Sequence, residues 1–218
     1  MADQRMQMEI DRKVRSMARL RNEGVPVIEH LPSLGCDPSR IQSAEDVARR
    51  ANIILLLALF AEPNGMPRNI TLSHLDLRGL RAHLTPGERS FLNEENPSEK
   101  LRGPFTWQYE SANILLWALG YIEALGSPTG YCVPAEVSAV IATRTVEQMI
   151  EHAKYRTADE MFDEADLIFR YHWAARDAAL RGQAPPAGLI HPVCYYRHYA
   201  FNWLIDCETD WDHVDTST

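Results

Sequence analysis

The stretch Ile53–Ala61 reads IILLLALFA, and every one of its nine side chains is apolar. A helix that is apolar on all sides belongs inside a core, so this stretch predicts a central buried helix. Nine residues are too few to cross a bilayer, which takes about 20. Ser43, with Asp46 three residues later, resembles a capping box, and we therefore expect this helix to cover residues 44–61.

Start and stop signals outside this stretch predict further helices. Thr85 precedes Pro86 and Glu88, and Thr157 precedes Asp159 and Glu160, which are patterns typical of helix starts. The expected helices cover residues 3–23, 71–81, 86–93, 104–121, 135–141, 145–152, 158–180 and 192–206, and Gly103-Pro104 is expected to interrupt any longer helix that begins near Ser98. The first carries Met6, Ile10, Val14, Met17 and Leu20 at helical spacing.

No stretch alternates apolar and polar residues over a strand's length, so the pattern predicts an all-α protein. We expect residues 1–218 to form a single compact, irregular multi-helix domain around the central apolar helix. Residues 25–41, rich in proline and glycine, are predicted to be an ordered loop, and residues 207–218 an acidic C-terminal tail.

Composition excludes several classes of protein. Apolar residues make up 45% of the chain, too many for a disordered protein, and no apolar run is long enough for a membrane span. The 22 basic and 30 acidic residues give a net charge of −8, which argues against nucleic acid as a partner. Phosphate-loop, dinucleotide-binding and zinc-protease motifs are absent, so no cofactor is expected.

The cysteines and the first residues predict a cytoplasmic protein. Met1–Gln4 shows no basic segment leading into an apolar one, so we expect no signal peptide. The cysteines, which stand far apart and form no CxxC pair, are Cys36, Cys132, Cys194 and Cys207. We expect reduced thiols. Cys194 and His198 share a helical face at metal-ligand spacing, but two packed side chains explain them better than a metal site does.

Polar side chains inside apolar helices are the candidate functional residues. Glu110 shares a face with Ile114 and Trp117, and His172 lies within the apolar stripe of residues 158–181, with Asp166 at its edge. Arg197 and His198 lie in an aromatic-rich helix. A buried arginine cannot lose its proton and needs an acceptor, so we expect Arg197 to contact Glu110 or, second, Asp166.

This cluster has two interpretations. It is either a satisfied polar network that fixes the register of the helices, or an acid/base site in which Glu110 or His172 is the base and Arg197 binds an anion. The structural interpretation is favoured.

Several segments in combination resemble a bacterial family catalogued as domain of unknown function 4272. They are Trp107-x-x-Glu110 with residues 115–120, residues 163–168 with His172-Trp173, residues 197–204, and the closing residues 211–218. The resemblance covers roughly residues 12–218. It implies an all-helical cytoplasmic bacterial protein and supplies no activity, cofactor or catalytic residue.

The leading functional hypothesis is a non-enzymatic protein-interaction module with an unidentified protein partner. The alternative is a hydrolase- or transferase-type enzyme with Glu110, Asp166, His172, Arg197 and His198 around a pocket. A third and weaker hypothesis is a metal-binding protein that uses His172, His198 and acidic side chains. The sequence does not indicate an oligomeric state.

Acidic charge gathers in two short segments. Residues 145–166 carry 2 basic and 7 acidic groups, and residues 206–218 carry 0 and 5, whereas residues 167–205 between them carry 4 and 1. Asp210, Asp212 and Asp215 lack the glycine and glutamate of an EF-hand loop, so we interpret them as a solvated acidic tail. Opposite charge suggests that this tail folds back over the basic stretch with His172 and Arg197.

Overall fold

A computed structural model describes residues 2–218, with side chains from residue 4 onward. The helices are α1 (Ala2–Asn22), α2 (Ala44–Ala61), α3 (Arg68–Leu77), α4 (Pro86–Asn93), α5 (Glu99–Thr106), α6 (Gln108–Ala118), α7 (Pro134–Ala142), α8 (Val146–Glu151), α9 (Ala158–Leu180) and α10 (His191–Leu204). Short 3₁₀ turns lie at η1 (Pro38–Arg40), η2 (Arg81–His83), η3 (Pro186–Gly188) and η4 (Trp211–His213). No strand occurs in residues 2–218, so the predicted all-α fold is confirmed. Met1, part of the predicted domain, lies outside the described residues.

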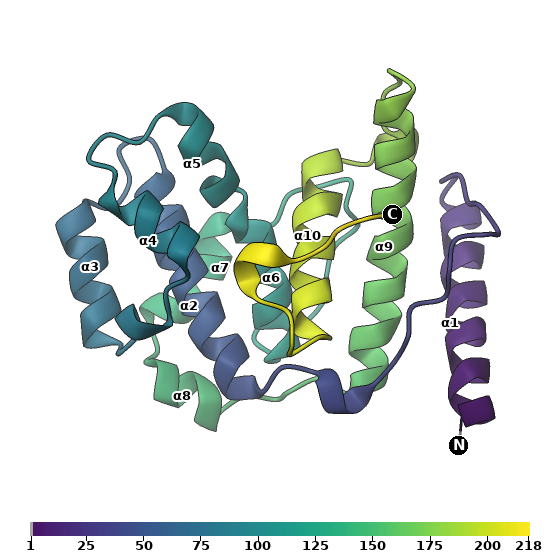
Figure 1. Cartoon of the computed structure of the whole chain (residues 1–218), viewed down its shortest axis with the longest axis horizontal. Helices are drawn as coiled ribbons and strands as arrows, with labels where there is room; N and C mark the ends of the chain where they lie inside the picture. The colour runs from purple at the N-terminus through teal and green to yellow at the C-terminus, as the bar shows by residue number, and fades with distance from the viewer. Residues whose placement is uncertain (1) are drawn as a thin grey trace.

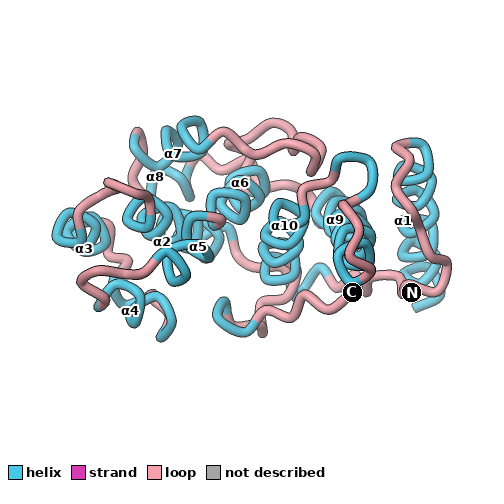
Figure 2. Tube along the Cα trace, turned by 90° about the horizontal axis from the view of Figure 1, so that it is seen from above, coloured by secondary structure: helices cyan, strands magenta, loops and turns pink. Residues whose placement is uncertain are grey.

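The larger helices form a row, as Figures 1 and 2 show. α2 packs against α6, α6 against α10, α10 against α9, and α9 against α1 at the end of the row. The short helices α3, α5 and α8 pack around α2. No helix of residues 2–218 is both long enough and apolar enough to span a membrane.

The central apolar helix is present as predicted. Residues 51–58 of α2 are buried on every side, with Ile53, Leu55 and Leu57 fully enclosed. The backbone N–H of Asp46 donates to Ser43 Oγ, which caps the first turn. The helix starts predicted at Thr85 and Thr157 are present, and each is a complete capping box, because the Glu88 and Glu160 carboxylates accept hydrogen bonds from the backbone N–H of the capping threonines. Local start signals therefore place several helices.

The predicted bounds of two helices are wrong. The break expected at Gly103-Pro104 lies instead at Trp107, because Pro104 is accommodated inside α5. Proline frees the carbonyl four residues earlier, at Lys100, which is exposed to water. The helix expected over residues 71–81 begins at Arg68 and ends at Leu77.

The first helix does not pack as its apolar pattern predicts. Only Met17 and Leu20 of its apolar stripe are buried, whereas Met6, Ile10 and Val14 are 57%, 42% and 59% exposed. α1 instead contacts α9 through charged groups. They include Arg12, whose Nε donates to Asp163 Oδ1 over 2.6 Å, and Arg15, whose Nη2 bonds the same carboxylate.

Residues 206–218 form a strap across α10, which we call the C-terminal strap (Figure 1). Trp211 is buried beside Trp203 and beneath the Arg50 guanidinium, and its carbonyl accepts a hydrogen bond from the Tyr199 hydroxyl. Asn202 Nδ2 donates to the Asp215 carbonyl over 2.7 Å. The predicted fold-back of the tail is therefore present.

Asp210, Asp212 and Asp215 are exposed to solvent, as predicted, but the tail that carries them is also docked on the fold. Asp212 accepts hydrogen bonds from Thr85 Oγ1 at 2.7 Å and from the Gly87 N–H at 2.8 Å, at the beginning of α4. The positive end of the α4 helix dipole favours a carboxylate there. The acidic tail is a structural element that ties α4 and α10 together.

Candidate functional site

Glu110 and Arg197 form a buried ion pair, as burial of the arginine predicted. Arg197 Nε donates to Glu110 Oε2 over 2.9 Å, and both side chains are at most 5% exposed. Two further groups of the pair are engaged: Cys132 N–H donates to Glu110 Oε1 at 2.7 Å, and Arg197 Nη1 donates to the Gly126 carbonyl at 2.5 Å. The pair therefore joins α6, α10 and the loop that carries residues 126–132.

Asp166 pairs elsewhere, with Arg170 one turn along α9. Arg170 Nε and Nη2 donate to the two Asp166 oxygens at 2.9 and 2.7 Å, and both residues are buried. Arg170 Nη2 also reaches the Pro32 carbonyl at 3.1 Å, which attaches the 25–41 loop to α9. Bidentate geometry makes this pair stronger than an exposed helix pair.

His172 and His198 contact each other directly between α9 and α10. Their Nδ1 atoms lie 2.9 Å apart, so one ring donates a proton and the other accepts it. Both are at most 2% exposed. Burial lowers the pKa of His172 to about 3, with the nearby His198, His191 and Arg176 adding to the shift, and lowers that of His198 to about 4. The pair is neutral at neutral pH.

The five candidate residues therefore belong to three separate pairs, one of them completed by Arg170, and no cavity found among the described residues is shared by them. Only Arg197 borders a void, of about 20 Å³, together with Arg19, Glu164 and Tyr171. That volume holds about one water molecule. Burial raises the pKa of Glu164, which sequence analysis did not single out. The described residues contain no cluster of three or more side chains placed to bind a metal ion.

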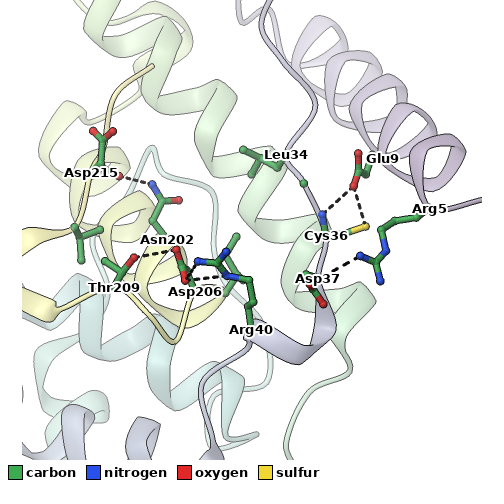
Figure 3. Close-up of a pocket in the computed structure, with 13 residues that line it drawn as sticks. Arg5, Glu9, Leu34, Cys36, Asp37, Arg40, Asn202, Asp206, Thr209 and Asp215 are labelled. Atoms are coloured by element: carbon green, nitrogen blue, oxygen red, sulfur yellow. Dashed lines mark hydrogen bonds and ion pairs between the residues drawn. The ribbon is translucent and has the colours of Figure 1, made fainter. Parts of the chain in front are cut away.

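An open cleft of about 540 Å³ lies elsewhere, between α1, the 34–40 segment, the end of α10 and the C-terminal strap (Figure 3). We call it the α1–α10 cleft. Its apolar lining consists of Leu34, Ile205 and Val214. Its volume falls within the range of about 300–1,000 Å³ typical of ligand sites.

The polar lining of this cleft is rich in carboxylates. Arg40 Nη2 pairs with Asp206 Oδ1 at 2.6 Å, and Arg5 Nη1 lies 3.9 Å from Asp37 Oδ2 (Figure 3). Hydrogen bonds from Ser39 lower the pKa of Asp37. Although burial opposes it, hydrogen bonds from Arg40 and neighbouring groups leave the pKa of Asp206 lowered. Both carboxylates are therefore ionised at neutral pH.

Glu9 and Asp215 line the cleft and form no ion pair among the described residues, although the charge of Arg176 contributes to the lowered pKa of Asp215. Glu9 Oε1 accepts from the Cys36 N–H at 3.0 Å and from the Cys36 thiol at 3.5 Å. Asp215 Oδ1 accepts from Ser217 N–H and Oγ, and these bonds lower the pKa of Asp215. Burial raises the pKa of Cys36, so its thiol stays protonated.

Sequence analysis missed this cleft because its walls come from three distant segments. Arg5 and Glu9 share a face of α1, but Asp37 and Arg40 lie about 30 residues later, and Asp206 more than 160 residues after that. The one available signal is the acidic composition of residues 206–218, which indicates a charged wall but not what faces it.

Comparison with known proteins gives one match. The model of a family described as "Domain of unknown function (DUF4272)" matches residues 12–214. No curated protein and no solved structure matches the chain. The matched range includes most of the cleft lining and all three buried pairs.

Proposed function

The chain belongs to the family of the domain of unknown function DUF4272, and we propose that it is a protein-interaction module that binds its partner in the α1–α10 cleft. The proposal includes a bacterial cytoplasmic location and a single domain. Four free cysteines support the first. An apolar core cluster that extends from Leu20 to Trp211 supports the second.

The observation that carries this proposal is the contrast between the buried pairs and the cleft. Glu110, Asp166, His172, Arg197 and His198 all bond to protein groups, and the void beside Arg197 admits about one water. The α1–α10 cleft instead opens to solvent, with apolar and charged groups side by side. Such a surface fits binding better than it fits acid/base chemistry.

The exposed stripe of α1 supports the same proposal. Met6, Ile10 and Val14 lie on the helix that supplies Arg5 and Glu9 to the cleft. Exposed apolar groups next to polar ones are typical of protein-binding surfaces.

Site-specific photo-crosslinking in living cells tests the proposal. Gly35 lines the cleft, and a Cβ built there meets no atom within 4 Å, so a photoreactive side chain fits without disturbing the fold. Gly130 is an equally open, exposed glycine outside the cleft and is the matched control. We expect a discrete protein adduct from position 35 and none from position 130. Equal labelling from both positions, or none from position 35, contradicts the proposal.

An acid/base enzyme of the hydrolase or transferase class is the second candidate. The observation in its favour is that Glu164, with its raised pKa, and Arg197 border the same small void. A substrate would have to displace the loop around Gly126 and Pro128 to reach them. Turnover of any substrate that is lost in Glu164→Gln, with the fold intact, would favour this candidate over the interaction module.

A further inference from the structure

We propose that the α1–α10 cleft takes a lysine or arginine side chain from a basic segment of the partner protein. This inference rests on the proposed function and adds the chemistry of the partner. The charges on the cleft walls and the apolar groups between them support it.

The charges that line the cleft do not balance. Its carboxylates are Glu9, Asp37, Asp206 and Asp215, and its guanidinium groups are Arg5 and Arg40. Four minus two leaves an excess of two negative charges. Arg40 also pairs with Glu208 outside the lining, at 2.9 Å, so it offers no surplus of positive charge.

The two unpaired carboxylates come from different walls. Glu9 lies on α1 on one side of the cleft, and Asp215 lies on the C-terminal strap on the other (Figure 3). Each has one oxygen engaged by protein donors and a second oxygen without a donor among the described residues. A basic segment laid across the cleft therefore meets a hydrogen-bond acceptor on each wall.

The lining between these carboxylates suits a long side chain with a charged end. Leu34, Ile205 and Val214 supply apolar surface for a methylene stem, while the carboxylates receive the charged head. The polar groups Asn202 and Thr209 add further hydrogen-bonding capacity. A carboxylate or phosphate ligand would meet like charge on both walls, which disfavours anionic partners.

The surroundings of the cleft add to the attraction. The C-terminal strap carries five acidic and no basic residues, so its field draws cations toward the wall that holds Asp215. Because these groups are near the surface, the attraction weakens as salt rises. A basic segment of a protein matches both the charge and the apolar lining of the cleft, whereas a free metal ion matches only the charge.

Titration of the ¹⁵N-labelled full chain with a short lysine- and arginine-rich peptide tests this inference. A peptide of the same length with glutamine in place of each basic residue is the ligand control, and spermidine and Mg²⁺ alone are competing probes. Glu9→Gln/Asp215→Asn removes the two unpaired charges and keeps hydrogen-bond acceptors. Glu95→Gln/Glu136→Gln makes the same charge change at two exposed acids outside the cleft and is the matched control.

We expect the basic peptide to shift resonances of Gly35, Asn202 and Thr209, and the glutamine peptide to shift none. The variant Glu9→Gln/Asp215→Asn loses two partly exposed charge pairs with the peptide, so its affinity for the basic peptide should be about 3- to 10-fold lower. The control variant should bind as the unsubstituted chain does.

Three results would overturn the inference. They are no binding of the basic peptide, equal weakening in both double variants, or cleft shifts from spermidine or Mg²⁺ with none from the peptide. Crosslinking at Gly35 to a partner whose contact segment is not basic overturns this inference alone. Failure of that crosslinking overturns the proposed function itself.

Discussion

Arg197 Nε lies 2.9 Å from Glu110 Oε2, and together these two residues hold α6, α10 and the 126–132 loop in one register. Both partners are buried, and both Glu110 oxygens accept hydrogen bonds from protein groups. The effect of breaking the pair is measurable.

Removal of one partner of this pair should destabilise the fold strongly. Glu110→Gln leaves the Arg197 charge buried without a counter-charge, which costs about 3–5 kcal/mol. The double variant Glu110→Gln/Arg197→Met removes both charges and should lose less than the single variant. Urea unfolding measures both. A loss within about 0.5 kcal/mol in Glu110→Gln would show that the pair is not buried as described.

Stability should fall in acid because of His172 and His198. Their pKa values in the folded chain, about 3 and about 4, lie below the ordinary value of 6.5. Below pH 6.5 these two histidines take up protons in the unfolded chain but stay neutral in the folded chain. The free energy of unfolding is therefore highest above pH 6.5 and decreases as the pH falls toward 4. Thermal unfolding between pH 7 and 4 should show the decline.

The double variant His172→Phe/His198→Leu is the control for this pH dependence. Replacing both members of a buried hydrogen bond by apolar groups costs little at neutral pH. Its melting temperature should fall less between pH 6.5 and 4 than that of the unsubstituted chain. Parallel curves for the two proteins would assign the acid effect to other groups.

The C-terminal strap should contribute to stability through Trp211. This side chain is 4% exposed and packs on Trp203 and under Arg50, so Trp211→Ala should cost about 3–5 kcal/mol. Removal of residues 207–218 should cost at least as much. His213→Ala, at an exposed position of the same strap, should change stability by less than about 0.5 kcal/mol. If removal of residues 207–218 leaves the free energy of unfolding unchanged, the strap is not docked on α10.

The exposed stripe of α1 predicts a contrast within one helix. Leu20→Ala removes a fully buried side chain and should cost about 2–5 kcal/mol, whereas Val14→Ala removes a side chain that is 59% exposed and should cost less than about 0.5 kcal/mol. Denaturant midpoints measure both. A large loss in Val14→Ala would mean that this face of α1 is covered in solution.

Local signals predict much of this fold. The apolar residues 53–58 and the caps at Ser43, Thr85 and Thr157 act within a few residues of the chain, so the sequence alone places the helices that they begin. The contact between Glu110 and Arg197 is also predictable, because each buried charge requires the other.

Features that depend on tertiary packing are not predictable in this way. The stripe of Met6, Ile10 and Val14 has the spacing of a core face, yet α1 packs through Arg12 and Arg15. The partnership of His172 with His198 depends on how α9 and α10 meet. The α1–α10 cleft needs three segments brought together, and none of them carries a motif of its own.

The most direct test of the central claim is the affinity of the crosslinked partner for a chain whose cleft is blocked. Gly35→Trp places an indole in the α1–α10 cleft, and Gly130→Trp places the same group at an open site outside it. Calorimetric titration should show at least about tenfold weaker binding to Gly35→Trp and unchanged binding to Gly130→Trp, with equal melting temperatures. Equal affinity of the partner for both variants would contradict binding in the cleft.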